Sequence, residues 1–167
     1  MKRPSMYGKH ESSLKIFSDL FNSTKDRLPL VMQIYQTENF RDDGVIVNTK
    51  SGKRVTFDWE IRDKYFENSK FKFDTLGQFE RKIKKDEIGL SLQCDKTETA
   101  IMVAWHEDWM NEKAQKISLS TDTRFREKGT IRYTKNFVIY PYIDMGKFRS
   151  MIYKAIESET FNHEVFA

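Results

Sequence analysis

Residues 44–82 read GVIVNTKSGKRVTFDWEIRDKYFENSKFKFDTLGQFERK, and the central sheet is predicted from this segment. Residues 44–49 and 54–62 are rich in β-branched side chains and flank a Ser-Gly turn, which is typical of a β-hairpin. Because strand side chains alternate between faces, Asp58 and Glu60 share a charged face, and the intervening apolar side chains share the other. The hairpin therefore predicts a sheet with one packed face and one charged face.

Residues 76–83 decide whether that charged face gains further functional groups. If this segment is extended, Gln78, Glu80 and Lys82 point the same way, so that an acidic residue on one strand faces Glu-x-Lys on the next. The rival is a helix over residues 75–85, because Gln, Glu, Arg and Lys all favour helices. The sequence leaves both alternatives open.

Helices are predicted on either side of this region. Apolar residues recur at steps of three and four over residues 12–25 and 144–159, which indicates amphipathic helices. Residues 1–10 are predicted to be an irregular arm, and residues 31–40 fit either a helix or a strand. Later strands are expected at 88–94, 100–105, 117–120, 130–134 and 137–142. This order predicts an α+β fold: one domain over residues 1–167, with a mixed central sheet flanked by an N-terminal and a C-terminal helix.

Composition narrows the class of protein. The 167 residues include 38% hydrophobic and 14% aromatic residues, enough for one domain with a sizeable core. The formal net charge of +4 permits nucleic-acid binding without demanding it. The single cysteine, Cys94, excludes an intramolecular disulfide and a multi-cysteine zinc site, and we expect it to be a small buried residue. No apolar run approaches the ~20 residues of a membrane span, so we expect a cytoplasmic protein without a membrane partner.

The charged face carries the chemistry that a metal-dependent phosphodiesterase needs. Asp58 and Glu80 offer hard oxygen ligands for Mg²⁺ or Mn²⁺, with Glu60 as a further carboxylate. Lys82 would orient or deprotonate the attacking water and offset charge in the transition state, and Gln78 would position water or phosphate. The competing interpretation is a salt-bridged solvent face. No P-loop, dinucleotide fingerprint or nucleophile elbow offers a different catalytic site.

On these residues the chain resembles the PD-(D/E)XK, or restriction-endonuclease-like, nuclease superfamily. The resemblance covers residues 44–82, and its motif would fall on Asp58, Glu80 and Lys82. The family has a helix, a β-meander that carries the acidic residues, and then further helix and strand elements. The resemblance implies Mg²⁺-dependent hydrolysis of DNA, favoured over RNA. Two departures are visible: Phe57 rather than proline precedes Asp58, and a strand follows the motif where the family places a helix.

Two further clusters are candidates for binding. Arg124, Arg126, Arg132 and Lys135 alternate with aromatic residues and would contact nucleic-acid phosphates, or they form the solvated face of a sheet. The run His106-Glu107-Asp108 offers metal ligands, but consecutive residues rarely reach one ion, so a polar loop is the simpler interpretation.

The sequence also supports an alternative of a different class. The protein would then be a non-catalytic module, of phage or mobile-element origin, that binds nucleic acid or protein through its aromatic and basic surface. Both interpretations permit a homodimer.

Overall fold

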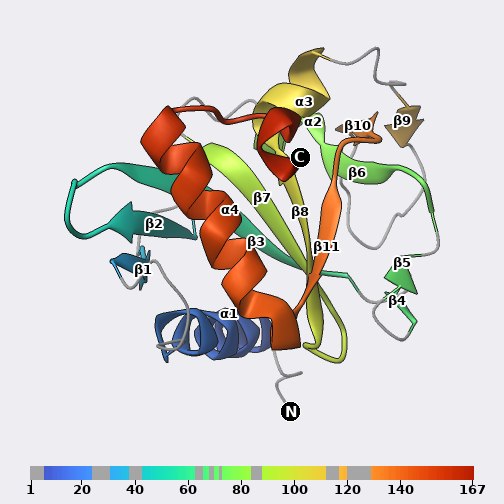
Figure 1. The fold of residues 1–167 in the computed structure, drawn as a ribbon. Coiled ribbons are helices and arrows are strands. Elements are labelled where there is room, and N and C mark those ends of the chain that lie inside the picture. The colour runs from blue at the N-terminus through green and yellow to red at the C-terminus, as the bar shows by residue number, and fades with distance from the viewer. Residues whose placement is uncertain are drawn as a thin grey trace.

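The computed structural model describes residues 6–23, 31–37, 43–62, 66–67, 70–71, 73–83, 88–111, 117–119 and 129–167. Its centre is a six-stranded sheet in the order β1-β2-β3-β7-β8-β11 (Figure 1). These strands are Met32–Gln36 (β1), Gly44–Asn48 (β2), Arg54–Arg62 (β3), Ile88–Asp95 (β7), Ala100–Trp105 (β8) and Val138–Pro141 (β11). Strand β3 pairs with β7 in parallel and every other neighbouring pair in this sheet is antiparallel. The predicted α+β class with a mixed sheet is confirmed.

Two helices, α1 (Met6–Ser23) and α4 (Met145–Ser158), pack against one face of this sheet (Figure 1). Phe17 of α1 is fully buried and stacks on Trp59 of β3, with ring centroids 4.8 Å apart. Phe148 of α4 meets Phe17 edge to face at 5.6 Å. These rings form one core cluster with the apolar side chains of β3, β7 and β8. The apolar face that was predicted for the second strand of the hairpin is therefore the face on which the two helices pack.

The predicted irregular arm over residues 1–10 is wrong for residues 6–10, which form the first turns of α1. Tertiary contacts explain the earlier start. His10 Nε2 lies 2.7 Å from the Trp59 carbonyl oxygen, and Trp59 Nε1 donates to Ser13 Oγ at 2.8 Å. These contacts anchor the N-terminal end of α1 on β3, which outweighs the low helix propensity of Gly8. Residues 1–5 lie outside the described part of the chain.

A second layer covers the other face of the sheet. It contains a three-stranded sheet in the order β6-β10-β9, a short β4-β5 hairpin and two short helices. Their bounds are Phe66–Glu67 (β4), Lys70–Phe71 (β5), Leu76–Phe79 (β6), Glu80–Ile83 (α2), His106–Asn111 (α3), Ile117–Leu119 (β9) and Gly129–Thr134 (β10). Leu76, Ile83 and Trp109 form an apolar cluster with Met102 and Ala104 of β8. Strand β8 is therefore buried on both faces, as its continuously apolar sequence suggests.

Short 3-10 helices complete the described fold, η1 (Tyr142–Asp144) before α4 and η2 (His163–Phe166) after it. The polar loop predicted at His106-Glu107-Asp108 is wrong, since these residues begin α3. Within the described ranges, no helix is both long enough and apolar enough to cross a membrane.

Candidate functional site

The candidate site lies on the face of the central sheet that is opposite α1 and α4. On β3, Asp58 and Glu60 point to this face because their neighbours Phe57 and Trp59 belong to the core on the other side. The parallel register pairs Asp58 with Ser91 and Glu60 with Gln93. A row of polar side chains therefore runs along two adjacent central strands, where a solvent-shielded sheet would ordinarily carry apolar ones.

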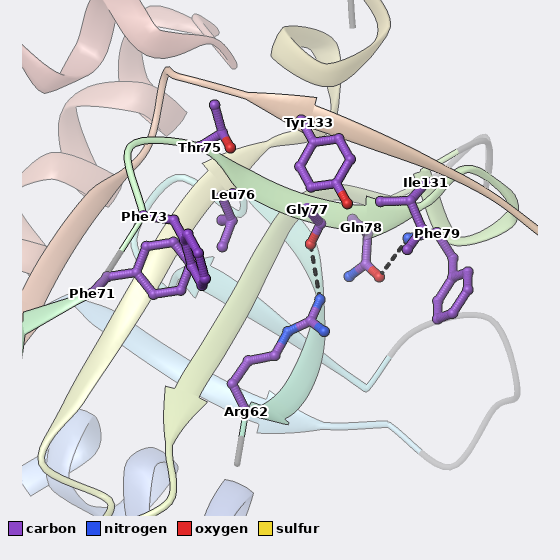
Figure 2. A pocket seen from close by; sticks show the side chains of 10 residues that line it. All are labelled: Arg62, Phe71, Phe73, Thr75, Leu76, Gly77, Gln78, Phe79, Ile131 and Tyr133. Atoms are coloured by element: carbon purple, nitrogen blue, oxygen red, sulfur yellow. Dashed lines mark hydrogen bonds between the residues drawn. The ribbon is translucent and has the colours of Figure 1, made fainter. Parts of the chain in front are cut away.

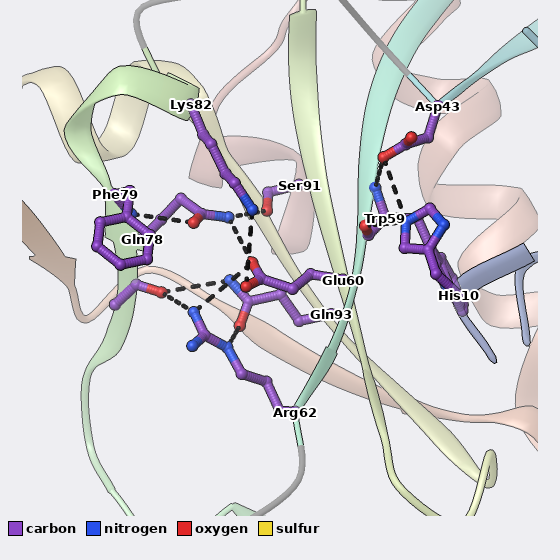
Figure 3. A network of polar contacts seen from close by, with 11 residues as sticks. His10, Asp43, Trp59, Glu60, Arg62, Gln78, Phe79, Lys82, Ser91 and Gln93 are labelled. Atoms are coloured by element: carbon purple, nitrogen blue, oxygen red, sulfur yellow. Dashed lines mark hydrogen bonds and ion pairs between the residues drawn. The ribbon is translucent and has the colours of Figure 1, made fainter. Parts of the chain in front are cut away.

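Strand β6 and helix α2 bring two more polar side chains to Glu60 (Figure 3). Gln78 Nε2 donates to Glu60 Oε2 at 3.1 Å and to Ser91 Oγ at 3.4 Å. Lys82 Nζ lies 3.7 Å from Glu60 Oε1. The Glu60 carboxylate therefore meets an amide donor on one oxygen and an ammonium group on the other, and Glu60, Gln78 and Lys82 come together as one cluster.

Residues 76–83 combine the two alternatives left open by the sequence. Strand β6 pairs with β10 and ends at Phe79, and α2 begins at Glu80. At the junction the Gln78 side-chain oxygen accepts the Phe79 backbone N–H at 2.9 Å. An acidic residue in the first turn of a helix is favourable, because the free N–H groups there carry partial positive charge. The consequence is that Glu80 and Lys82 point to different partners.

Glu80 is engaged away from the Glu60 cluster. Arg132 of β10 donates from Nη2 and Nε to Glu80 Oε1, at 2.9 and 3.2 Å, and the two side chains are only 11% and 15% exposed. Arg132 Nη1 also donates to the carbonyl oxygens of Trp109 and Met110 in α3. The pair therefore ties β10 to α2 and α3. Of the other predicted phosphate-binding residues, Lys135 lies exposed after β10, while Arg124 and Arg126 lie outside the described residues.

Asp43 is a further carboxylate beside the predicted site, and the sequence reasoning missed it. It directly precedes β2, and continuing the β2–β3 register, in which Gly44 pairs with Phe57, sets Asp43 opposite Asp58. Its Oδ2 accepts the Trp59 backbone N–H at 2.8 Å, and His10 Nε2 lies 3.6 Å away (Figure 3). The nearby Asp43 carboxylate raises the pKa of His10 above its ordinary value, against the opposing effect of burial. The sequence signal was the Asp-Asp-Gly run that opens the hairpin.

A pocket of about 440 Å³ lies next to the Glu60 cluster, with which it shares Gln78. Figure 2 shows the side chains that line it. Aromatic side chains from β5, β6 and β10 and from the segment before β6 form much of its lining: Phe71, Phe73, Phe79 and Tyr133. Arg62 and Gln78 also line it, and both reach the Glu60 cluster. Arg62 donates to Gln93 Oε1 at 2.7 Å and to the Gly77 carbonyl oxygen at 2.8 Å, with Glu60 Oε2 3.8 Å away. The pocket and the cluster are therefore contiguous.

The other residues singled out from the sequence occupy separate places. Cys94 is fully buried, and burial raises the pKa of its thiol to about 12, as expected for a structural residue. Asp108 of α3 contacts His163 of η2, with Oδ1 and Nδ1 2.6 Å apart. Among the described residues, no group of three or more His, Cys, Asp or Glu side chains is arranged to hold a metal ion.

Comparisons of the chain with family models, with curated proteins and with solved structures found no match.

Proposed function

We propose that the protein is a metal-dependent nuclease of the PD-(D/E)XK kind, acting on DNA in preference to RNA. The observation that carries the proposal is the polar face of β3, where Glu60 meets Gln78 and Lys82 and where Asp58 lies on the same face, two residues away. A carboxylate pair, an amide and an ammonium group are the side chains that metal-assisted phosphodiester hydrolysis uses.

The order of elements supports the same proposal. Helix α1 is followed by the antiparallel meander β1-β2-β3, which carries Asp58 and Glu60. After the short strands β4, β5 and β6 come helix α2 and strand β7, which lies parallel to β3. This is the order of the family that residues 44–82 resemble: a helix, an acidic meander, and then helix and strand.

The residues present fit a magnesium or manganese ion with one change in the predicted ligand set. Mg²⁺ usually takes one or two protein carboxylates and keeps several waters. Asp58 and Glu60 lie two residues apart on one face of β3, whereas the Glu80 carboxylate is already bonded twice by Arg132. In the proposal Glu60 therefore takes the place of Glu80 and acts with Asp58. Such an ion supplies a polarised phosphate and a bound water of lowered pKa.

The chain's own groups hold and orient the reacting parts. In hydrolysis a water oxygen adds to phosphorus while the bond to one ester oxygen breaks. Lys82 offsets negative charge that grows on the phosphoryl oxygens, and its contact with Glu60 fixes the direction of that carboxylate. Gln78 holds Glu60 from the other side and is itself held by its bonds to Ser91 and to the Phe79 backbone.

The test is a cleavage assay with Mg²⁺ and Mn²⁺ on single- and double-stranded DNA and RNA. We expect metal-dependent cutting that Asp58→Asn and Lys82→Ala each reduce by at least about 100-fold, the typical contribution of one positioned acid or base. The matched controls are Asp19→Asn and Lys15→Ala, which remove an exposed ion pair on α1 at the opposite face of the sheet and should leave the rate unchanged.

Two results would overturn the nuclease proposal. One is that the Asp58 and Lys82 variants cleave as fast as the wild type, which would show that these side chains take no part in the reaction. The other is a folded wild-type protein that cuts no substrate with either metal. If that protein still bound DNA with a steep salt dependence, the non-catalytic binding module would be the better account.

A further inference from the structure

The aromatic pocket next to Glu60 has the size and walls of a ligand site. Its volume of about 440 Å³ lies within the range of roughly 300–1,000 Å³ that is usual for small-molecule sites. Phe73 is 49% exposed and meets Phe71 edge to face, with ring centroids 5.7 Å apart. Tyr133 lies over Gly77, where an added Cβ would come within 3.0 Å of the tyrosine ring. Gly77 thus leaves room for the ring, and the pocket presents aromatic surfaces to a flat partner.

Polar groups at the pocket are available to such a partner. Arg62 uses Nε and Nη2 for Gln93 and Gly77, while its Nη1 makes no hydrogen bond within the described part of the chain. The hydroxyls of Thr75 and Tyr133, which also line the pocket, form no hydrogen bond to described residues either. A planar ligand with hydrogen-bonding edges would satisfy these donors and acceptors, whereas a purely apolar ligand would leave them unpaired.

The place of the pocket identifies the class of ligand. Arg62 and Gln78 belong to both the pocket lining and the Glu60 cluster, so a group held in the pocket lies directly beside the proposed phosphodiester site. A nucleobase attached to a backbone phosphate has this geometry, with a flat ring for the aromatic walls and an anion for the basic groups. In a duplex the bases are stacked and paired, so a base enters such a pocket only from a single strand or after it leaves the stack.

We propose that the pocket holds one unstacked nucleobase of a single-stranded nucleic acid and so sets the neighbouring phosphodiester against Glu60 and Lys82. This inference rests on the proposed nuclease function, since it names the substrate class of the same site. It gives the pocket aromatics a role in binding that is separable from the chemistry of the carboxylates.

The test measures binding without cleavage. Fluorescent oligonucleotides of one sequence, as single-stranded DNA, duplex DNA and single-stranded RNA, are titrated with protein in EDTA at several salt concentrations. A second set carries one 2-aminopurine between two abasic positions, so that it has no stacked neighbour and its fluorescence falls when the base stacks on an aromatic ring of the protein. The variants are Phe73→Ala and Tyr133→Ala. The matched control is Tyr35→Ala, because Tyr35 of β1 is 48% exposed on another part of the sheet, close to the 49% of Phe73.

We expect single strands to bind more tightly than the duplex and to quench 2-aminopurine. Each pocket variant should weaken single-strand binding about tenfold and remove the quenching, since one base–aromatic stack is worth roughly that factor. Tyr35→Ala should change neither. The DNA and RNA arms show which backbone is preferred. The proposal would be overturned if the pocket variants bound single strands as tightly as Tyr35→Ala does. It would also be overturned if the wild type did not quench 2-aminopurine, a result that does not depend on how the variants fold.

The outcomes separate this inference from the nuclease proposal. If quenching depends on Phe73 but the protein cuts nothing with Mg²⁺ or Mn²⁺, the base-pocket proposal stands and the nuclease proposal fails. If Lys82→Ala abolishes metal-dependent cutting but Phe73→Ala changes neither binding nor quenching, the nuclease proposal stands and the base-pocket proposal fails.

Discussion

Among single residues, Glu60 and Glu80 differ in how closely cations hold each carboxylate. Glu60 has Lys82 Nζ at 3.7 Å, Arg62 Nη2 at 3.8 Å and an amide donor at 3.1 Å. Glu80 accepts two hydrogen bonds from Arg132 in a largely buried pair. A planar guanidinium that donates twice holds a carboxylate more firmly than a single ammonium group at longer range. The structure thus gives Glu80 a supporting role and leaves Glu60 the candidate for chemistry.

Replacement of Glu80 tests the supporting role. Glu80→Gln should lower the free energy of unfolding by about 2 to 3 kcal/mol, because Arg132 then stays buried without an anionic partner. Urea unfolding at neutral pH measures the loss. Asp19→Asn, which breaks the exposed Lys15 pair, should change the free energy by less than about 0.5 kcal/mol. A Glu80 variant as stable as the Asp19 variant would contradict the assigned role.

His10 should make stability depend on pH. Its pKa is raised in the folded state by the nearby Asp43 carboxylate, so its contribution to stability is complete below the ordinary pKa of 6.5 and is lost as the pH rises through the folded value. The difference in free energy of unfolding between wild type and His10→Gln should therefore be larger at about pH 5.5 than at about pH 9. Urea titrations at both pH values measure it. A difference that stays constant, or that grows with pH, would speak against this assignment.

The positions of some of these residues could be predicted from the sequence and those of others could not, for a physical reason. Strand alternation is a local property, so it placed Asp58 and Glu60 on one face, away from the core. The Glu80–Arg132 pair joins residues 52 positions apart in the chain. The pairing of β10 with β6 brings Arg132 to Glu80, and a local sequence pattern does not predict such a long-range pairing. Asp43 escaped notice because it stands before the strand, where alternation no longer applies.

At the scale of elements, periodic segments were predictable and the junction of β6 with α2 was not. The predicted hairpin agrees closely with β2 and β3, and the predicted helix over residues 144–159 agrees closely with α4. Residues 76–83 mix strong helix formers with a strand pattern, and the pairing of Leu76–Phe79 with β10 decides the outcome. Helix propensity then prevails only where that pairing ends.

The turn between β7 and β8 depends on Asp95. Its carboxylate accepts the backbone N–H groups of Thr99 at 2.7 Å and Ala100 at 3.0 Å, and it is also bonded by the hydroxyls of Thr97 and Thr99. Burial alone would raise the pKa of Asp95, but these hydrogen bonds outweigh burial and hold the pKa below its ordinary value of 3.8. The charged form is therefore the one that the folded turn stabilises.

Asp95→Asn should lower the free energy of unfolding by about 1 to 2 kcal/mol at neutral pH. Because the folded-state pKa is depressed, the contribution of the carboxylate is present above pH 3.8 and is lost as the pH falls through the folded value. The gap between wild type and variant should narrow at about pH 3. Unfolding at the two pH values, with Asp19→Asn as the exposed control, measures this. An equal gap at both would show that charge plays no part in the turn.

At the scale of the whole molecule, the two faces of the central sheet have different roles. Helices α1 and α4 close one face with a continuous apolar core. The second layer packs against the other face through Leu76, Ile83 and Trp109, and polar side chains remain beside it on β3 and β7. The sequence predicted the helices and the mixed sheet from local periodicity. It could not place the second layer, because that layer depends on the pairing of the short strand β6 with β10, which is far away in the sequence.

In the proposed nuclease, cleavage depends on Glu60 rather than on Glu80, and a comparison of two variants tests this. The initial rate of Mg²⁺-dependent cleavage of a single-stranded DNA is compared between Glu60→Gln and Glu80→Gln, at a temperature where both variants are folded. We predict that Glu60→Gln loses at least about 100-fold of the rate while Glu80→Gln stays within a few-fold of wild type. Full activity in Glu60→Gln, or loss confined to Glu80→Gln, would contradict the account.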